Sequence, residues 1–260
     1  MGVDEVGVEN YWYLVLAVGG YMTGWFVVSV IKRRNDIADV AWGLGFVMLA
    51  WLAFYLGGYS VRSLVVNGLV SMWGLRLAWH IFLRNRKKKE DYRYKKWEGV
   101  GWLAYVRSFV QVFMLQGALM LVIASPVVYV NLSANSRWGL LDWIGLVVWL
   151  IGFSFEVVAD WQLKKFLEDK NNKGKIVREG LWRYSRHPNY FGEVVMWWGL
   201  LVMALSISGG WMTVVGPVMI TYLILFVSGV PLLEKKYEGR KDFEEYKRVT
   251  SVFIPWFPKK

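Results

Sequence analysis

The chain has 260 residues, of which 56% are hydrophobic and 17% aromatic, and its mean hydropathy is +0.32. Soluble proteins contain about 45–50% apolar residues, so this composition excludes an ordinary soluble domain and predicts an integral membrane protein. With no cysteine and only two histidines, the chain has no thiolate chemistry, and we expect no metal site built by the protein.

Seven apolar segments are long enough to cross a bilayer, which takes about 20 helical residues. Their sequences lack the alternation of a membrane β-barrel, so we expect helices. In chain order the segments cover residues 11–31, 39–56, 63–83, 102–124, 138–166, 188–205 and 211–233. We therefore predict an all-α integral membrane protein, a bundle of seven transmembrane helices forming a single domain over residues 1–260.

Positive charge predicts the orientation of this bundle. The net charge is +11, and most lysines and arginines lie in the stretches 32–34, 84–96, 164–186 and 235–260. Seven spans place these four stretches on one side, which the positive-inside rule assigns to the cytosol. The amino terminus is then outside and the carboxyl terminus is cytosolic. Because the positive charge follows topology, we expect a bilayer rather than a nucleic acid as its partner.

The stretch GLWRYSRHPNYFGEVVMWWG, residues 180–199, predicts an anion site at the start of a helix. Proline is tolerated in a first helical turn because the N–H that it lacks would have no partner there. The other early N–H groups and the helix dipole favour an anion such as phosphate. The loop before Pro188 adds polar and basic side chains, namely Arg183, Tyr184, Arg186 and His187.

Polar side chains recur every four residues in three of the predicted helices, which places each set on one helix face. Ionisable groups inside a span cost about 2.5–3.5 kcal/mol each by the lower estimates, so they usually face a cavity or a partner. The sets are Arg76, His80 and Arg84 with the adjacent Asn85; Glu156, Asp160 and Lys164; and Asn189 and Glu193.

Each set has a functional and a structural interpretation. The basic set suits an anionic ligand, or consists of snorkelling and packed side chains. The acidic set suits ribose hydroxyls, a substrate or a protonated general acid, or forms salt bridges with Arg76 or Arg107. Asn189 suits an amide ligand, and Glu193, one turn deeper, is a candidate catalytic carboxylate. In the structural interpretation Asn189 caps the helix and Glu193 pairs an arginine.

Weaker candidates lie elsewhere in the chain. Asp39 and Trp42 in DVAWGLGF and Gln116 in QVFMLQG are expected to contact a substrate, with Asp39 as a candidate acid. An intramembrane glutamine can also simply bond a neighbouring helix. The tail, with Tyr237 and Tyr246, is expected either to close over a cofactor or to bind anionic headgroups.

Four stretches together resemble the DUF1295 family, the bacterial and archaeal branch of the steroid 5-alpha-reductase-like membrane proteins. They are GLWRYSRHPNYFGE, ADWQLKKF, DVAWGLGF and DFEEYKRVTSVFIPW. The likeness covers nearly the whole chain, with the reductase-like region at about residues 100–260. RHPxY followed by an acid is also shared with isoprenylcysteine carboxyl methyltransferases and phospholipid methyltransferases, so this motif indicates the superfamily better than the reaction.

The resemblance implies a prokaryotic membrane enzyme that binds NADPH from the cytosolic side. It would reduce a carbon–carbon double bond in a lipid-soluble substrate, such as a steroid-like, isoprenoid or fatty enone. Asn189 and Glu193 match a cofactor-contacting pair of the reductases, and Asp160 matches an aspartate of the fifth span. The reductases also grip the enone with a glutamine–glutamate pair early in the chain. Asp39 is the only acid within the second segment, residues 39–56, which leaves the proton donor open.

Two other functions remain open from the sequence. An S-adenosylmethionine-dependent methyltransferase of a prenyl or phospholipid acceptor would use the same motif with a cationic cofactor that needs fewer arginines. A non-catalytic lipid-binding or transport protein would also carry charges inside its spans. The absence of a GxGxxG sequence indicates that any dinucleotide site is not of the Rossmann type.

Overall fold

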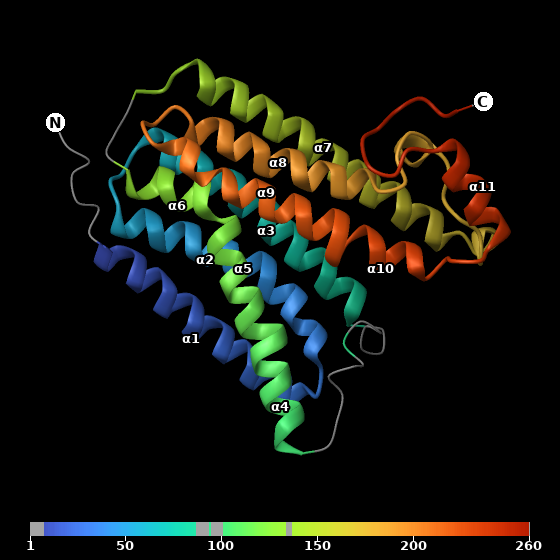
Figure 1. Cartoon of the computed structure of the whole chain (residues 1–260), viewed down its shortest axis with the longest axis horizontal. Coiled ribbons are helices and arrows are strands. Elements are labelled where there is room, and N and C mark those ends of the chain that lie inside the picture. Colours follow the sequence, from blue (N-terminus) through green and yellow to red (C-terminus); the bar gives the residue numbers. More distant parts are fainter. Residues whose placement is uncertain (1–7, 87–93, 95–100, 134–136, 260) are drawn as a thin grey trace. The chain divides into compact units, whose positions relative to one another are not determined.

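The computed structural model describes residues 8–86, 94, 101–133 and 137–259, and the regular elements among them are all helical (Figure 1). The longer helices are α1 (Val8–Lys32), α2 (Ala38–Leu56), α3 (Val61–Asn85), α7 (Leu140–Glu168) and α8 (Pro188–Ala204). The shorter α-helices are α4 (Trp102–Ser108), α5 (Leu115–Ile123), α6 (Ser125–Leu132), α9 (Val215–Tyr222), α10 (Val230–Lys235) and α11 (Lys241–Val249). Short 3₁₀ or π-helical turns connect them, namely η1 (Asn35–Ile37), η3 (Phe109–Met114), η4 (Lys170–Asn172), η5 (Gly180–Arg183), η6 (Gly210–Val214) and η7 (Leu223–Val227).

All seven apolar segments predicted from the sequence are helical, and five candidate spans are long and apolar enough to cross a membrane. These five are Glu9–Lys32, Asn35–Leu56, Trp102–Ile123, Leu140–Glu168 and Gly210–Lys235. The third and sixth segments correspond to α3, which carries several charged residues, and α8, which has 17 residues. The helical membrane character is confirmed, while the count of seven spans and the side of each terminus stay predictions.

The chain divides into two compact units, which are described separately. Unit 1 comprises residues 1–138 and 206–216, and unit 2 comprises residues 139–205 and 217–260. Unit 1 contains α1 to α6, η6 and the first two residues of α9. Unit 2 contains α7, α8, α9 from Pro217 onward, α10 and α11. That the whole chain forms one domain remains a prediction.

In unit 1, α2 and α3 cross at a pair of glycines. A Cβ atom built on Gly43 would lie 2.5 Å from the carbonyl oxygen of Gly74, and one on Gly74 equally close to that of Gly43. Only glycine permits this approach of two backbones, as is common where helices pack inside membranes. The contact fixes the height of Asp39 on α2 relative to Arg84 on α3.

In unit 2, α7 and α8 run side by side (Figure 1) and approach closely at two glycine pairs. A Cβ on Gly152 would lie 2.6 Å from the carbonyl oxygen of Gly192, and one on Gly145 would lie 2.6 Å from that of Gly199. The two glycines on each helix are seven residues apart, so they lie on one face of that helix. This packing sets the acidic residues of α7 against the polar start of α8.

Candidate functional site

The turn that leads into α8 is held against α7. Trp182 is buried and donates its indole N–H to the carbonyl oxygen of Ala159 at 3.1 Å. The backbone N–H of Leu181 donates to the side-chain oxygen of Gln162 at 3.0 Å. The helix then begins at Pro188, as the sequence predicted. The stretch from Arg183 to His187 therefore has a fixed place at the end of α7.

Two of the three basic side chains in this turn bind one carboxylate. Glu234 on α10 accepts from Nε of Arg186 at 2.8 Å and lies 3.1 Å from Nε2 of His187. Arg186 and His187 are largely buried, with 9% and 8% of their side chains exposed. Arg186 also donates to the backbone oxygens of Lys247 and Thr250. Two of the side chains predicted to hold a phosphate, Arg186 and His187, are thus already engaged by an internal carboxylate.

A second polar contact joins α7 to the first turn of α8. Nδ2 of Asn189 donates to Oδ1 of Asp160 at 3.1 Å, so two residues predicted from separate helices to form the cofactor site are in contact. Both are partly buried. Glu156 and Glu193 lie one turn deeper on the same helices, Glu156 being 3% exposed. The pair presents an amide and a carboxylate, which together can donate to and accept from a ligand.

The remaining basic candidates of unit 2 lie at its surface. Lys164 is exposed and forms a loose ion pair with Glu168, at 3.9 Å along α7. Arg183 is exposed as well. An anion arriving from solvent would meet these two cations first, because Arg186 and His187 are engaged by Glu234.

The C-terminal segment after α11 covers the turn before α8. The backbone N–H of Arg186 donates to Ser251 at 2.9 Å, and that of Trp256 donates to Tyr184 at 2.9 Å. The hydroxyl of Tyr246 donates to the carbonyl oxygen of Trp182. Burial raises the pKa of Tyr246. The side chain of Tyr246 therefore holds the backbone of this turn in position. The sequence did not suggest this role.

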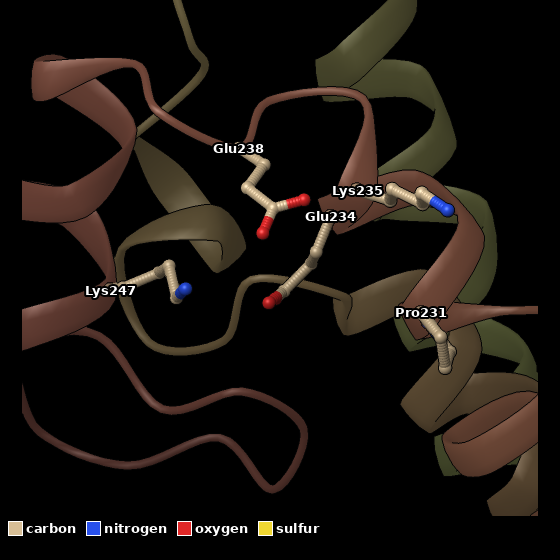
Figure 2. Close-up of a pocket in the computed structure, with 5 residues that line it drawn as sticks. All are labelled: Pro231, Glu234, Lys235, Glu238 and Lys247. Atoms are coloured by element: carbon tan, nitrogen blue, oxygen red, sulfur yellow. The ribbon is translucent and has the colours of Figure 1, made fainter.

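A pocket of about 280 Å³ opens between α10, the turn after it and α11 (Figure 2). It is lined by Pro231, Glu234, Lys235, Glu238 and Lys247. Figure 2 shows the carboxylates of Glu234 and Glu238 directed into this space, with Lys247 facing them from α11 and Lys235 pointing away. The pocket gives solvent a route to the carboxylate that binds Arg186 and His187.

Unit 1 carries a separate polar cluster. The hydroxyl of Tyr94 donates to Oδ1 of Asp39 at 2.6 Å, and Nε2 of Gln116 lies 3.5 Å from the same hydroxyl. Arg84 lies 4.0 Å from the other carboxylate oxygen of Asp39. Tyr94 is 5% exposed and Asp39 is 15% exposed. Asp39 and Gln116, predicted as substrate contacts from different segments, thus meet through Tyr94.

The other candidates of unit 1 surround this cluster. Asn85 accepts from Nε of Arg84 at 3.1 Å through its side chain and from Arg34 at 3.3 Å through its backbone. Trp42 packs edge-on against Phe46, with ring centroids 5.0 Å apart. Further back on α3, Arg76 and His80 are partly buried.

Two residues of these clusters were missed in the candidate set. Glu234 directly follows the last apolar segment and precedes the basic tail. A carboxylate at this position indicates an ion pair with a basic residue. Tyr94 lies in the charged loop EDYRY, and its partner is 55 residues away in the sequence. No local pattern indicates such a contact. Most of that loop, residues 87–93 and 95–100, lies outside the described residues.

Comparison with known proteins decides the family. The profile described as "Protein of unknown function (DUF1295)" matches residues 25–250. The chain belongs to the DUF1295 family. The resemblance found in the sequence motifs is therefore confirmed over most of the chain.

Curated relatives connect this DUF1295 chain with steroid reductases. It is 27% identical over 195 residues to an uncharacterized protein of Schizosaccharomyces pombe, covering 65% of this chain and 55% of the relative. It is 32% identical over 122 residues to 3-oxo-5-alpha-steroid 4-dehydrogenase 1 of Bos taurus, covering 44% of each. Identity to steroid 5-alpha-reductase DET2 of Arabidopsis thaliana is 31% over 114 residues, covering 44% of this chain and 40% of the relative. The chain spans about half the length of these relatives, and no solved structure matches it.

Proposed function

We propose that this DUF1295 protein is an NADPH-dependent membrane reductase of a carbon–carbon double bond in a lipid-soluble substrate. The observation that carries the proposal is the contact between Asp160 and Asn189 beside the basic turn before α8. Relatives named as steroid reductases support the reaction class. A steroid-like, isoprenoid or fatty enone is the substrate class that we propose.

The donor set of unit 2 fits a phosphorylated dinucleotide. The exposed Arg183 and Lys164 offer cations to phosphate groups, and the amide of Asn189 with the carboxylate of Asp160 offers a donor and an acceptor to hydroxyl or amide groups. Arg186 and His187 would add to the phosphate seat only where Glu234 releases them. Glu193 lies one helical turn below Asn189 and would orient the ligand from that face.

When bound, NADPH supplies the hydride. Unit 1, taken by itself, contains a polar cluster that could polarise a carbonyl group. The hydroxyl of Tyr94 donates its proton to Asp39, and it would polarise a carbonyl oxygen only after turning that proton from the carboxylate to the carbonyl. Hydrogen bonding to that oxygen stabilises the negative charge that develops there when a conjugated double bond is attacked. Gln116 and Trp42 would hold the apolar substrate beside this pair.

Ligand-induced thermal stabilisation tests the cofactor. Purified protein in nanodiscs should unfold at a higher temperature with NADPH than without it, because a ligand that binds only the native state stabilises it. Asn189→Ala should abolish the shift, whereas Asn171→Ala, in the exposed loop after α7, should keep it. A shift that is equal in both variants would contradict the assignment of the site to the start of α8.

An S-adenosylmethionine-dependent methyltransferase is the second candidate. It is favoured by the engagement of Arg186 and His187 with Glu234, because a cationic cofactor with one carboxylate needs fewer free cations than NADPH. Stabilisation by S-adenosylmethionine with none by NADPH would select this function.

We also propose the topology within which these sites act. The seven helical segments cross a prokaryotic cell membrane, the amino terminus is outside, and the start of α8 and the C-terminal segment face the cytosol. The cofactor is then available on the side where the basic residues lie.

A further inference from the structure

The C-terminal segment exposes apolar side chains beyond the last candidate span, which ends at Lys235. Ile254, Trp256 and Phe257 are 63%, 69% and 77% exposed. Exposed apolar residues within a span face lipid, but these lie outside every candidate span. Contiguous apolar groups at a surface usually mark a site of contact with a membrane or a partner.

Their backbone is held firmly in place. Ser185 donates from its hydroxyl to Phe253 at 2.7 Å, and the N–H of Trp256 donates to Tyr184 at 2.9 Å. Phe253 itself is buried and packs against Phe191 of α8, with ring centroids 5.7 Å apart. The segment is therefore an anchored platform whose outward side chains are presented to the surroundings.

The depth of this platform follows from α7. That helix has 29 residues, whereas about 20 cross the hydrocarbon core, so part of it extends past the core. The exposed charged residues of its last turns, Lys164, Lys165 and Glu168, indicate that this is the end that does so. Trp161 marks the boundary, because it is 58% exposed and has the ammonium of Lys165 5.3 Å from its ring. Tryptophan and lysine prefer the membrane–water interface.

The platform is connected to α7 at this level. Trp182 bonds to Ala159, and Leu181 bonds to Gln162. The C-terminal segment bonds in turn to Tyr184, Ser185 and Arg186. The exposed side chains of residues 252–257 thus lie near the level of Trp161, at the end of α7.

Exposed cations accompany the apolar groups. Arg183, Arg248 and Lys259 are exposed in or beside this segment. Aromatic side chains in the interface combined with basic residues fit a leaflet that carries anionic lipid headgroups.

We propose that residues 252–257 are an interfacial anchor that docks on the anionic cytosolic leaflet, with Ile254, Trp256 and Phe257 inserted at headgroup level. The proposal rests on the topology given under Proposed function. Its consequence is that the segment that covers the basic turn before α8 contacts both that turn, through its backbone, and the bilayer, through its exposed side chains.

A spin label tests the anchor, since the chain has no cysteine and a single introduced one is a unique site. Ile254→Cys carries a nitroxide and leaves both aromatic rings in place. The matched control is Lys173→Cys, an exposed position in the polar loop after α7. The full chain is placed in nanodiscs of mixed phosphatidylcholine and phosphatidylglycerol, and collision of the label with oxygen and with a water-soluble nickel chelate is measured.

The anchor predicts that the label at residue 254 collides several-fold less with the chelate than the label at residue 173, and more with oxygen. Adding Trp256→Ser and Phe257→Ser should return residue 254 to the control value. Equal chelate access at both sites would overturn the proposal. A label that is water-accessible in nanodiscs but protected in native membranes would also overturn it, in favour of a protein partner. The readout needs no cofactor, so it is independent of whether the protein is a reductase.

Discussion

At the scale of single residues, Glu234 is the internal partner of the basic turn before α8. One of its oxygens lies within hydrogen-bond distance of both Arg186 and His187. Partly buried charges of this kind are stable only in the presence of their partner. The carboxylate therefore has a structural role, and it competes with any phosphate for the side chains of Arg186 and His187.

Replacing Glu234 by glutamine keeps its shape and removes its charge. We expect a loss of about 1–3 kcal/mol in the free energy of unfolding, because the largely buried guanidinium of Arg186 and the imidazole of His187 lose a charged acceptor. The matched control is Glu238→Gln in the same pocket, at an exposed position. Thermal unfolding in detergent measures both, and equal behaviour of the two variants would show that the contact contributes nothing.

Tyr246 gives a pH-dependent prediction. Burial raises its pKa in the folded protein, while in the unfolded chain a tyrosine has a pKa of about 10. As the pH rises, this tyrosine therefore loses its proton first in the unfolded chain. The contribution of Tyr246 to the free energy of unfolding is complete below about pH 10 and falls as the pH rises above that value.

Tyr246→Phe removes this titration. We expect unfolding measured between about pH 9 and pH 11.5 to show a steeper loss of stability in the wild type than in the variant, since only the wild type carries the protected phenol. Parallel curves would rule out a buried, protonated hydroxyl at this position.

At the scale of the elements, the glycine pairs of α7 and α8 bring the polar residues together. A methyl group at Gly152 would meet the backbone of Gly192 at 2.6 Å and the backbone N of Met196 at 2.7 Å. Neither backbone can move without separating the helices. The contact between Asp160 and Asn189 lies eight residues from Gly152 and three from Gly192, so it depends on this crossing.

Gly152→Ala should therefore destabilise the protein by about 1–3 kcal/mol, the usual cost of overpacking. Gly68→Ala on α3 is the control, because nothing lies within 4 Å of its added methyl group, and alanine favours a helix by up to about 1 kcal/mol. Unfolding midpoints in detergent distinguish the two. A neutral Gly152→Ala would mean that the helices are not in close contact.

The sequence predicted the helices better than their contacts. Pro188 marks the start of α8 because proline acts locally on the backbone. Asn189 and Asp160 each stood out as polar residues in apolar helices, but their contact depends on the crossing at Gly152 and Gly192. Tyr94 was missed because its partner Asp39 lies 55 residues away, beyond the reach of a spacing rule within one helix. For Glu234, the position of a carboxylate beside the basic tail indicated an ion pair, but its partners, 47 and 48 residues away, could not be assigned from the sequence.

For the whole molecule, the topology can be tested with single cysteines. Tyr59 follows the second predicted span and is 67% exposed, and Lys259 ends the described tail. With seven spans, a membrane-impermeant thiol reagent added to intact cells should label Tyr59→Cys and should not label Lys259→Cys until the cells are permeabilised. Labelling of Lys259→Cys in intact cells would contradict the cytosolic carboxyl terminus.

The identity of the bound cofactor is the most direct test of the proposed reductase function. Native mass spectrometry of the full chain, extracted from its membrane into nanodiscs, reports the small molecule that remains bound. We predict NADPH or its oxidised form on the wild type and its loss in Asn189→Ala. S-adenosylmethionine or its demethylated product on the wild type would contradict the reductase function.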